Sequence, residues 1–146
     1  MDSSFPVLRQ TVIDATDTRR LAEFWRVLLG YTYRPGSEAP HAGPDPADDL
    51  GFFLVLHDAT GAPALAFQKV EGLPAATWPD GDVAQQLHLD LTVPTYEELD
   101  LQHSRALALG ARMLEDRADD EEEPLRVYSD PASHPFCIFV SPDQPA

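Results

Sequence analysis

Two ionisable side chains, His88 and Asp90, lie two residues apart in a segment where apolar and polar residues alternate. Alternation of this kind is typical of a half-buried strand, so both side chains are predicted to share one face. Histidine changes charge near neutral pH, so His88 could hydrogen-bond a ligand, bind a metal or act as a general base. The alternative is a structural histidine. Neighbours on one face of a strand stand roughly 7 Å apart, so we expect a bridging water or ligand rather than a direct His88–Asp90 pair.

Three further residues are candidates for the same site, and each has a structural alternative. Gln10 lies on the polar side of an earlier strand-like segment, where it could enter a pocket or be hydrogen-bonded at an interface between the two halves. Cys137, the one cysteine of the chain, is typical of a small buried side chain and would react only beside a positive charge that lowers its pKa. Trp78 lies in a proline-rich segment and could cap a pocket or remain an exposed linker residue.

The elements that position these residues follow from hydrophobic periodicity and from helix-capping residues. In the first half, Asp17 is a predicted N-cap, and apolar residues then recur at helical spacing until Gly30. The turn residues of Asp58–Gly61 separate two apolar runs and predict a hairpin. The predicted strands of this half are Leu8–Ala15, Tyr31–Arg34, Phe52–His57 and Ala64–Val70.

The second half repeats these signals. Thr95 and Glu98 form a predicted capping box at the start of a helix that ends at Gly110. The acidic run Asp116–Glu123 is typical of a solvated turn. The predicted strands of this half are Leu87–Val93, Ala111–Glu115, Leu125–Tyr128 and Phe136–Val140.

The repetition indicates an internal duplication. The same distance along the chain separates Gln10 from His88 and Asp17 from Thr95. Each half predicts one βαβββ module, so the fold class is α+β, with two tandem modules forming a cupped mixed sheet and the helices outside. The expected organisation is a single domain over 1–146, with module one over about 6–70, a linker over about 71–85 and module two over about 86–141.

The charge of the chain excludes several partners. Ten Lys and Arg residues stand against twenty-five Asp and Glu residues, which gives a net charge of −15. Nucleic acids and anionic membrane surfaces are bound through clustered basic residues, so neither is expected as a partner. The first residues resemble no signal peptide and no apolar run is long enough to span a membrane, so we expect a cytoplasmic protein.

Five segments together carry a resemblance to a known superfamily. They are VIDATD at Val12–Asp17, FWRVLLG at Phe24–Gly30, FQKV at Phe67–Val70, LHLDL at Leu87–Leu91 and SDPASHPFC at Ser129–Cys137. In this order they resemble the vicinal oxygen chelate superfamily, which includes glyoxalase I, extradiol dioxygenases and bleomycin-resistance proteins. More narrowly, the chain resembles bacterial glyoxalase-like domain proteins. The resemblance covers nearly the whole chain and is specific for the fold rather than for a reaction.

The resemblance implies two paired modules around a pocket, with a divalent metal held by a histidine or glutamine and a glutamate from each module. Gln10 and His88 match the first ligand position of their modules. The second positions fall at Leu65 or Phe67 in module one and at Cys137 in module two, and none of these is a carboxylate. Divalent ions in such sites depend on anionic oxygen ligands, so we expect no bound metal. If a metal does bind, Gln10 and His88 are its expected ligands.

These observations predict a glyoxalase-like protein that binds a small molecule through Gln10, His88, Asp90, Cys137 and Trp78. Two alternatives stay open: a divalent-metal-dependent lyase, isomerase or dioxygenase-like enzyme of the same superfamily, and an interaction domain without a ligand. The first strands of the modules are expected to pair across a pseudo-twofold axis, so that Gln10 and His88 face one cavity. Relatives of this fold pair their modules within or between chains, which predicts a homodimer.

Overall fold

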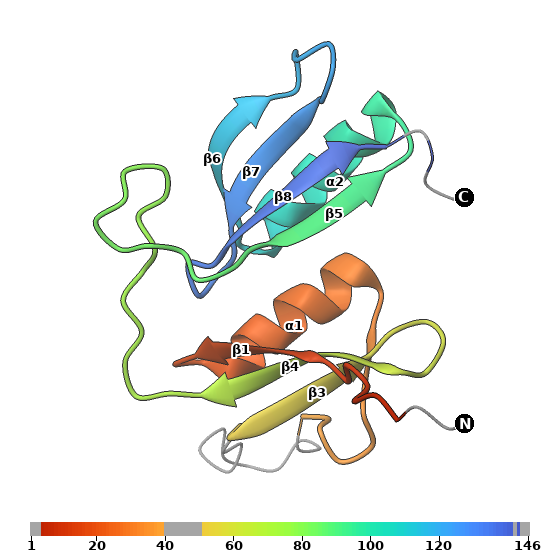
Figure 1. Ribbon diagram of the computed structural model, residues 1–146, viewed down its shortest axis with the longest axis vertical. Helices are drawn as coiled ribbons and strands as arrows, with labels where there is room; N and C mark the ends of the chain where they lie inside the picture. Colours follow the sequence, from red (N-terminus) through yellow and green to blue (C-terminus); the bar gives the residue numbers. More distant parts are fainter. Residues whose placement is uncertain (1–3, 40–50, 142, 144–146) are drawn as a thin grey trace. The chain divides into compact units, whose positions relative to one another are not determined.

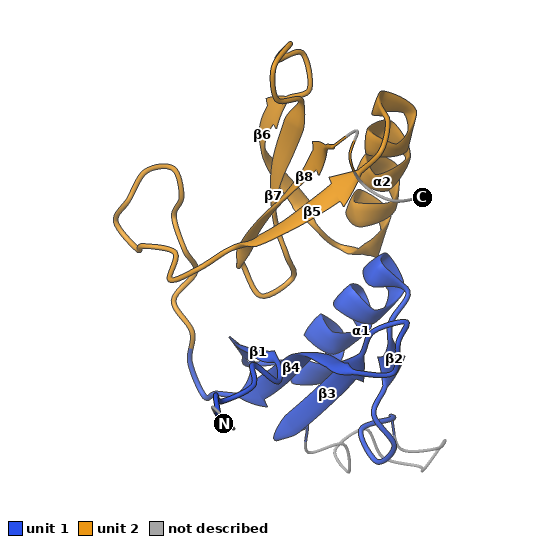
Figure 2. Cartoon of the chain, turned by 45° about the vertical axis from the view of Figure 1, so that its right-hand side comes forward, with its two compact units in different colours: residues 1–72 blue, residues 73–146 orange. Residues whose placement is uncertain are grey.

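The computed structural model describes residues 4–39, 51–141 and 143 of the chain (Figure 1). The chain divides into two compact units, residues 1–72 and 73–146 (Figure 2). Among the described residues, each unit contains one helix and four strands in the order strand, helix, strand, strand, strand. The fold is therefore α+β and consists of two tandem βαβββ modules, as the repeat in the sequence predicts. That the two units together form one domain stays a prediction.

The two units have equivalent sheets. The first unit contains β1 (Thr11–Ala15), α1 (Thr18–Leu29), β2 (Thr32–Tyr33), β3 (Phe53–His57) and β4 (Pro63–Lys69). The second contains β5 (Leu89–Val93), α2 (Tyr96–Leu109), β6 (Arg112–Arg117), β7 (Leu125–Ser129) and β8 (Pro135–Val140). The strand orders are β1-β4-β3-β2 and β5-β8-β7-β6. In each sheet the first and last strands of the module pair in parallel, and the other pairs are antiparallel. The predicted mixed sheet is thus observed as one four-stranded mixed sheet in each unit.

Local capping residues set the helix ends as predicted. The Asp17 carboxylate accepts a hydrogen bond from the Arg20 N–H at 3.1 Å, and Thr95 Oγ1 accepts one from the Glu98 N–H at 3.2 Å. Gly30 ends α1 with a φ of 69°, a left-handed conformation that disfavours residues with a Cβ. Neither helix of the described part of the chain has the length and hydrophobicity that a membrane span requires.

The helices pack on their sheets through apolar side chains. In the first unit the core consists of one face of α1 together with β3 and β4, and its largest fully buried side chains are Trp25, Phe67, Leu21, Leu56 and Val55. In the second unit, Tyr128, Phe136, Ile138 and Leu99 are fully buried. The Tyr128 and Phe136 rings stack with their centroids 5.2 Å apart. Each module therefore has apolar residues of its own to cover one face of its sheet.

Both first strands begin later than predicted. Leu8 is 88% exposed, and the pairing of β1 with β4 begins at Thr11. The pairing of β5 with β8 begins at Leu89, which lies opposite Phe136. Gln10 and His88 therefore occupy equivalent positions directly before β1 and β5 rather than within them.

Strand β6 is longer than predicted and includes the start of the acidic run. Asp116 pairs with Arg126 of β7 in the antiparallel register, and Arg126 Nε lies 3.2 Å from Asp116 Oδ1. Opposite charges directly across two strands stabilise the pairing, which explains why the charged sequence continues as a strand. The remaining acidic residues form the turn between β6 and β7, as predicted.

Candidate functional site

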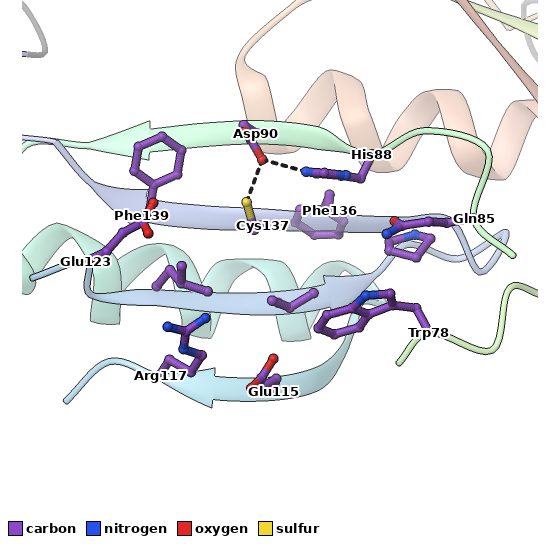
Figure 3. Close-up of a pocket in the computed structure, with 13 residues that line it drawn as sticks. Trp78, Gln85, His88, Asp90, Glu115, Arg117, Glu123, Phe136, Cys137 and Phe139 are labelled. Carbon is purple, nitrogen blue, oxygen red and sulfur yellow. Dashed lines mark hydrogen bonds and ion pairs between the residues drawn. The ribbon is translucent and has the colours of Figure 1, made fainter. Parts of the chain in front are cut away.

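The second unit contains a pocket of about 290 Å³ on the face of its sheet that α2 leaves uncovered (Figure 3). Its lining comes from β6, β7 and β8, from the start of β5, from the turn between β6 and β7, and from the irregular segment that precedes β5. The alternation along β8 explains how one strand serves two faces, since Cys137 lines the pocket while Ile138 is buried on the opposite face. Ligand pockets of this kind combine apolar walls with a few convergent polar groups.

Three polar side chains converge in this pocket (Figure 3). The Cys137 thiol donates a hydrogen bond to Asp90 Oδ1 with an S–O distance of 2.7 Å, and His88 Nε2 lies 3.1 Å from the same oxygen. Asp90 and Cys137 are brought together because they are paired residues of the parallel strands β5 and β8. The side chains of His88 and Asp90 are 48% and 56% exposed, so both are accessible to a ligand.

The direct His88–Asp90 contact corrects the sequence-based expectation of a bridging water or ligand. That expectation used the spacing of residues within a regular strand. His88 precedes β5, so its backbone is not held by the ladder, and the length of its side chain brings Nε2 to Asp90 Oδ1. His88 and Asp90 therefore contact each other directly, with no bridging group between them.

The environment of Cys137 keeps its sulfur protonated. Burial is the largest cause that raises the pKa of the Cys137 thiol, followed by the hydrogen bond to Asp90 and the negative charges of Asp90 and Glu123. Together they raise this pKa to about 12. Since the thiolate and not the thiol is the nucleophile, the geometry makes Cys137 a hydrogen-bond donor rather than a nucleophile.

This environment predicts slow alkylation. At pH 8, Cys137 is expected to react with iodoacetamide more than about tenfold more slowly than free cysteine, because so little of it is thiolate. Asp90→Asn should accelerate the reaction, since it removes the charge that disfavours the thiolate. Asp119→Asn, an equivalent change at an exposed position outside the pocket lining, should leave the rate unchanged. Mass spectrometry of the alkylated protein over time measures these rates, and a wild-type rate equal to that of free cysteine would contradict the assignment.

Aromatic and aliphatic side chains form the walls of the pocket. Trp78, which the sequence left between a pocket role and an exposed linker role, lines the pocket and is half-buried. Phe139 contributes a second accessible ring, whereas Phe136 is 1% exposed and belongs mainly to the core. Leu125 and Val127 of β7 supply aliphatic surface.

Sequence reasoning does not predict four polar residues of the lining: Gln85, Glu115, Arg117 and Glu123. Arg117 belongs to the run that the sequence indicates as a solvated turn but lies in β6, whereas Glu123 lies in the turn, is exposed and also lines the pocket. The signal that could have found them is the alternation of Glu115 and Arg117, which places both on one face once β6 extends to Arg117. Glu123 enters the lining at the end of the β6–β7 turn, for which the sequence carries no comparable signal.

Gln10 belongs to the first unit and is not part of this pocket lining. Its Oε1 atom is buried and has no hydrogen-bond partner among the described residues, a condition that it shares with Gln85 Oε1. Buried polar atoms are usually paired, so these two oxygens are exceptions in this structure. That Gln10 and His88 face one cavity stays a prediction.

The chain matches a family model described as a glyoxalase-like domain over residues 10–139. This match spans both modules and includes every candidate site residue. The chain therefore belongs to the glyoxalase-like domain family. A search of the curated proteins gives no match.

Two solved structures illustrate the fold that the chain shares with known proteins. A glyoxalase/bleomycin resistance protein/dioxygenase family enzyme from Burkholderia phytofirmans PsJN is 17% identical, with a TM-score of 0.65 over 90% of this chain and 96% of that chain. A variant of the fosfomycin resistance protein FosX from Listeria monocytogenes, complexed with Mn(II) and 1S,2S-dihydroxypropylphosphonic acid, is 16% identical, with a TM-score of 0.64 over 94% of both chains. At these identities the comparisons show a shared fold alone. What the site can bind or catalyse has to be argued from the residues of this chain.

The residues of this chain do not fit the metal set that the family resemblance implies. Leu65 and Phe67, at the second ligand position of the first module, are 6% and 0% exposed and belong to the apolar core. At the equivalent position of the second module, the Cys137 thiol donates a hydrogen bond to Asp90. Ligand atoms of His88, Asp90 and Cys137 do lie within 4.8 Å of one another. This nitrogen, oxygen and sulfur set is softer than the oxygen-rich set that Mn(II) prefers.

Proposed function

We propose that the protein binds a small molecule, without a bound metal, in the pocket of its second unit. The observation that carries this proposal is the hydrogen bond from the Cys137 thiol to Asp90, at the position where the resemblance implies a metal-binding glutamate. Trp78 and Phe139 supply apolar surface for the ligand, and His88 and Asp90 supply polar groups. This combination is the usual composition of a small-molecule site.

Two measurements on one purified sample test the proposal. Elemental analysis is expected to find no stoichiometric divalent metal. A thermal-shift screen with a diverse compound library is then expected to find ligands for this metal-free protein. A ligand at 100 times its Kd stabilises the folded state by about 2.7 kcal/mol, which raises the Tm by about 5 °C or more for a chain of this size.

Matched variants locate the binding in the pocket. Trp78→Ala removes an apolar wall and is expected to abolish the ligand-induced shift, whereas Phe52→Ala should retain it. Phe52 is 65% exposed in the first unit and lies outside the lining. A shift that persists in Trp78→Ala, or a library without ligands for metal-free protein, would overturn the proposal.

The alternative function is a divalent-metal-dependent lyase, isomerase or dioxygenase-like enzyme. The proximity of His88 Nε2, an Asp90 oxygen and Cys137 Sγ favours this alternative, because these atoms could converge on one ion after the thiol ionises. About one metal ion per chain, lost in His88→Ala, would support the enzyme over the metal-free binding protein. An interaction domain without a ligand is the weaker hypothesis, since it gives no reason for polar groups to converge in a pocket.

We also propose that the chain forms a homodimer. Large apolar side chains remain exposed on the first unit, among them Phe52 and Phe53, which are 65% and 41% exposed. Association of two chains would remove such side chains from water, which is favourable. Light scattering at micromolar concentration is expected to give the mass of two 16.1 kDa chains. The mass of a single chain would contradict this proposal.

A further inference from the structure

The charges that line the pocket of the second unit are mainly negative. Three carboxylates, those of Asp90, Glu115 and Glu123, belong to the lining, against one guanidinium, that of Arg117. The whole chain has the same sign, with a net charge of −15. The balance inside the pocket therefore depends on whether the Arg117 charge is available to a ligand.

The Arg117 charge is compensated by a carboxylate outside the lining. Arg117 Nη2 lies 3.1 Å from Asp120 Oδ2. The N–H groups of Glu123 and Glu122, followed by the Arg117 guanidinium, lower the pKa of Asp120, so Asp120 is ionised at neutral pH. This pair leaves Glu115 and Glu123 without an equal opposing charge from Arg117, while Asp90 is in contact with His88 Nε2.

The pKa of the Cys137 thiol is affected by the same negative charges. Asp90 and Glu123 both act electrostatically to raise the pKa of its thiol, after burial as the largest cause. Burial disfavours a charge of either sign, whereas the negative charges of Asp90 and Glu123 disfavour an anion in particular. The same carboxylates would repel a phosphonate or carboxylate ligand.

Aromatic rings beside these carboxylates suit a cation with an apolar body. Trp78 and Phe139 line the pocket and are both half-buried, so part of each ring faces the pocket space. The faces of aromatic rings attract ammonium groups, and tryptophan does so most strongly. Carboxylates and ring faces together are the groups that recognise organic cations.

We infer that this pocket binds an organic cation, a protonated amine or quaternary ammonium with an aromatic or aliphatic body. The inference rests on the proposed small-molecule function and specifies the class of ligand. The lining offers the carboxylates of Asp90, Glu115 and Glu123 to the charged group, and the ring of Trp78 or of Phe139 to the apolar body. This preference is opposite in charge to the phosphonic acid named with the FosX structure.

Three probes that share a benzyl group test the charge preference. Benzyltrimethylammonium, benzyl alcohol and benzylphosphonate are titrated into the wild-type protein, and binding is followed by saturation-transfer NMR, which detects weak complexes. We expect the ammonium probe to bind about tenfold or more tightly than the alcohol, since it adds ring and carboxylate attraction. We expect no binding of the phosphonate.

Charge-matched variants separate a local effect from the field of the whole chain. Glu123→Gln is expected to weaken the ammonium probe about threefold or more, with little change for benzyl alcohol. Glu121→Gln, which makes the same change of charge in the same turn but outside the lining, should leave both affinities unchanged. Equal losses in the two variants would overturn the local role of the lining carboxylates.

The outcomes also distinguish this inference from the proposed function. If benzyl alcohol or benzylphosphonate binds as tightly as the ammonium probe, and Trp78→Ala abolishes that binding, the pocket binds small molecules but the cation preference is wrong. If the ammonium probe does not bind while library compounds do, the inference fails and the binding function stands. If neither the probes nor the library compounds bind, both fail.

Discussion

The Cys137→Glu variant is expected to bind Mn(II) about tenfold or more tightly than the wild-type protein, because affinity for hard cations rises with the charge of the oxygen ligands. The substitution places a second carboxylate beside Asp90 on the neighbouring strand, with His88 in contact with the same Asp90 oxygen. Two adjacent carboxylates repel each other, and a divalent cation relieves that repulsion. Isothermal titration calorimetry on chelator-treated protein measures both affinities.

A neutral variant controls for the change of size at this position. Cys137→Gln has nearly the same volume as Cys137→Glu but adds no charge, so it should bind Mn(II) as weakly as the wild-type protein. If Cys137→Glu gains no affinity, or Cys137→Gln gains as much, the missing carboxylate does not explain the expected absence of a metal. The Cys137→Glu variant therefore tests whether cysteine, in place of the glutamate that the resemblance implies, is the reason why no metal is expected.

Replacing Phe67 with alanine is expected to lower the free energy of unfolding by about 3–5 kcal/mol, the usual cost of an aromatic-to-alanine change in a packed core. Phe67 lies on β4 between its partners Ile13 on β1 and Leu54 on β3, and its side chain is fully buried. The same substitution at Phe52, which is 65% exposed, should cost less than about 1 kcal/mol. Urea denaturation followed by circular dichroism gives both values.

The comparison of the two phenylalanine variants also tests whether Phe67 is a core residue rather than a ligand-binding residue. The resemblance brings Leu65 or Phe67 to a ligand position, but both side chains belong to the apolar core. If Phe67→Ala proved as mild as Phe52→Ala, the residue would not be a core residue. A ligand role at this position would then have to be reconsidered.

The sequence predicts the fold well because its decisive signals are local and occur twice. The caps at Asp17 and Thr95 involve contacts only three residues away, so they can be recognised in a short window. The repeated order of strands and helix then excludes most other topologies. What the sequence does not predict is the length of β6, since its last residues depend on pairing with Arg126, which comes from another strand.

The sequence suggests some of the residues that line the pocket, but not their contacts. His88, Asp90, Cys137 and Trp78 line one pocket, and Asp90 contacts Cys137 from 47 residues away because β5 and β8 pair in parallel. The direct contact of His88 with Asp90 depends on where the ladder of β5 begins, which the alternation of residues does not reveal. Glu123 reaches the pocket from a turn whose composition alone indicates only solvation.

The turn between β6 and β7 contributes to the pocket without being part of the strand ladder. It carries Glu123 into the pocket lining and holds Arg117 through Asp120, while the strands on either side pair through backbone hydrogen bonds that do not depend on these side chains. Loops accept substitutions and insertions more readily than the elements they connect. A lineage could therefore exchange one ligand for another by changing a few residues of this turn, with the paired strands of the sheet inherited intact.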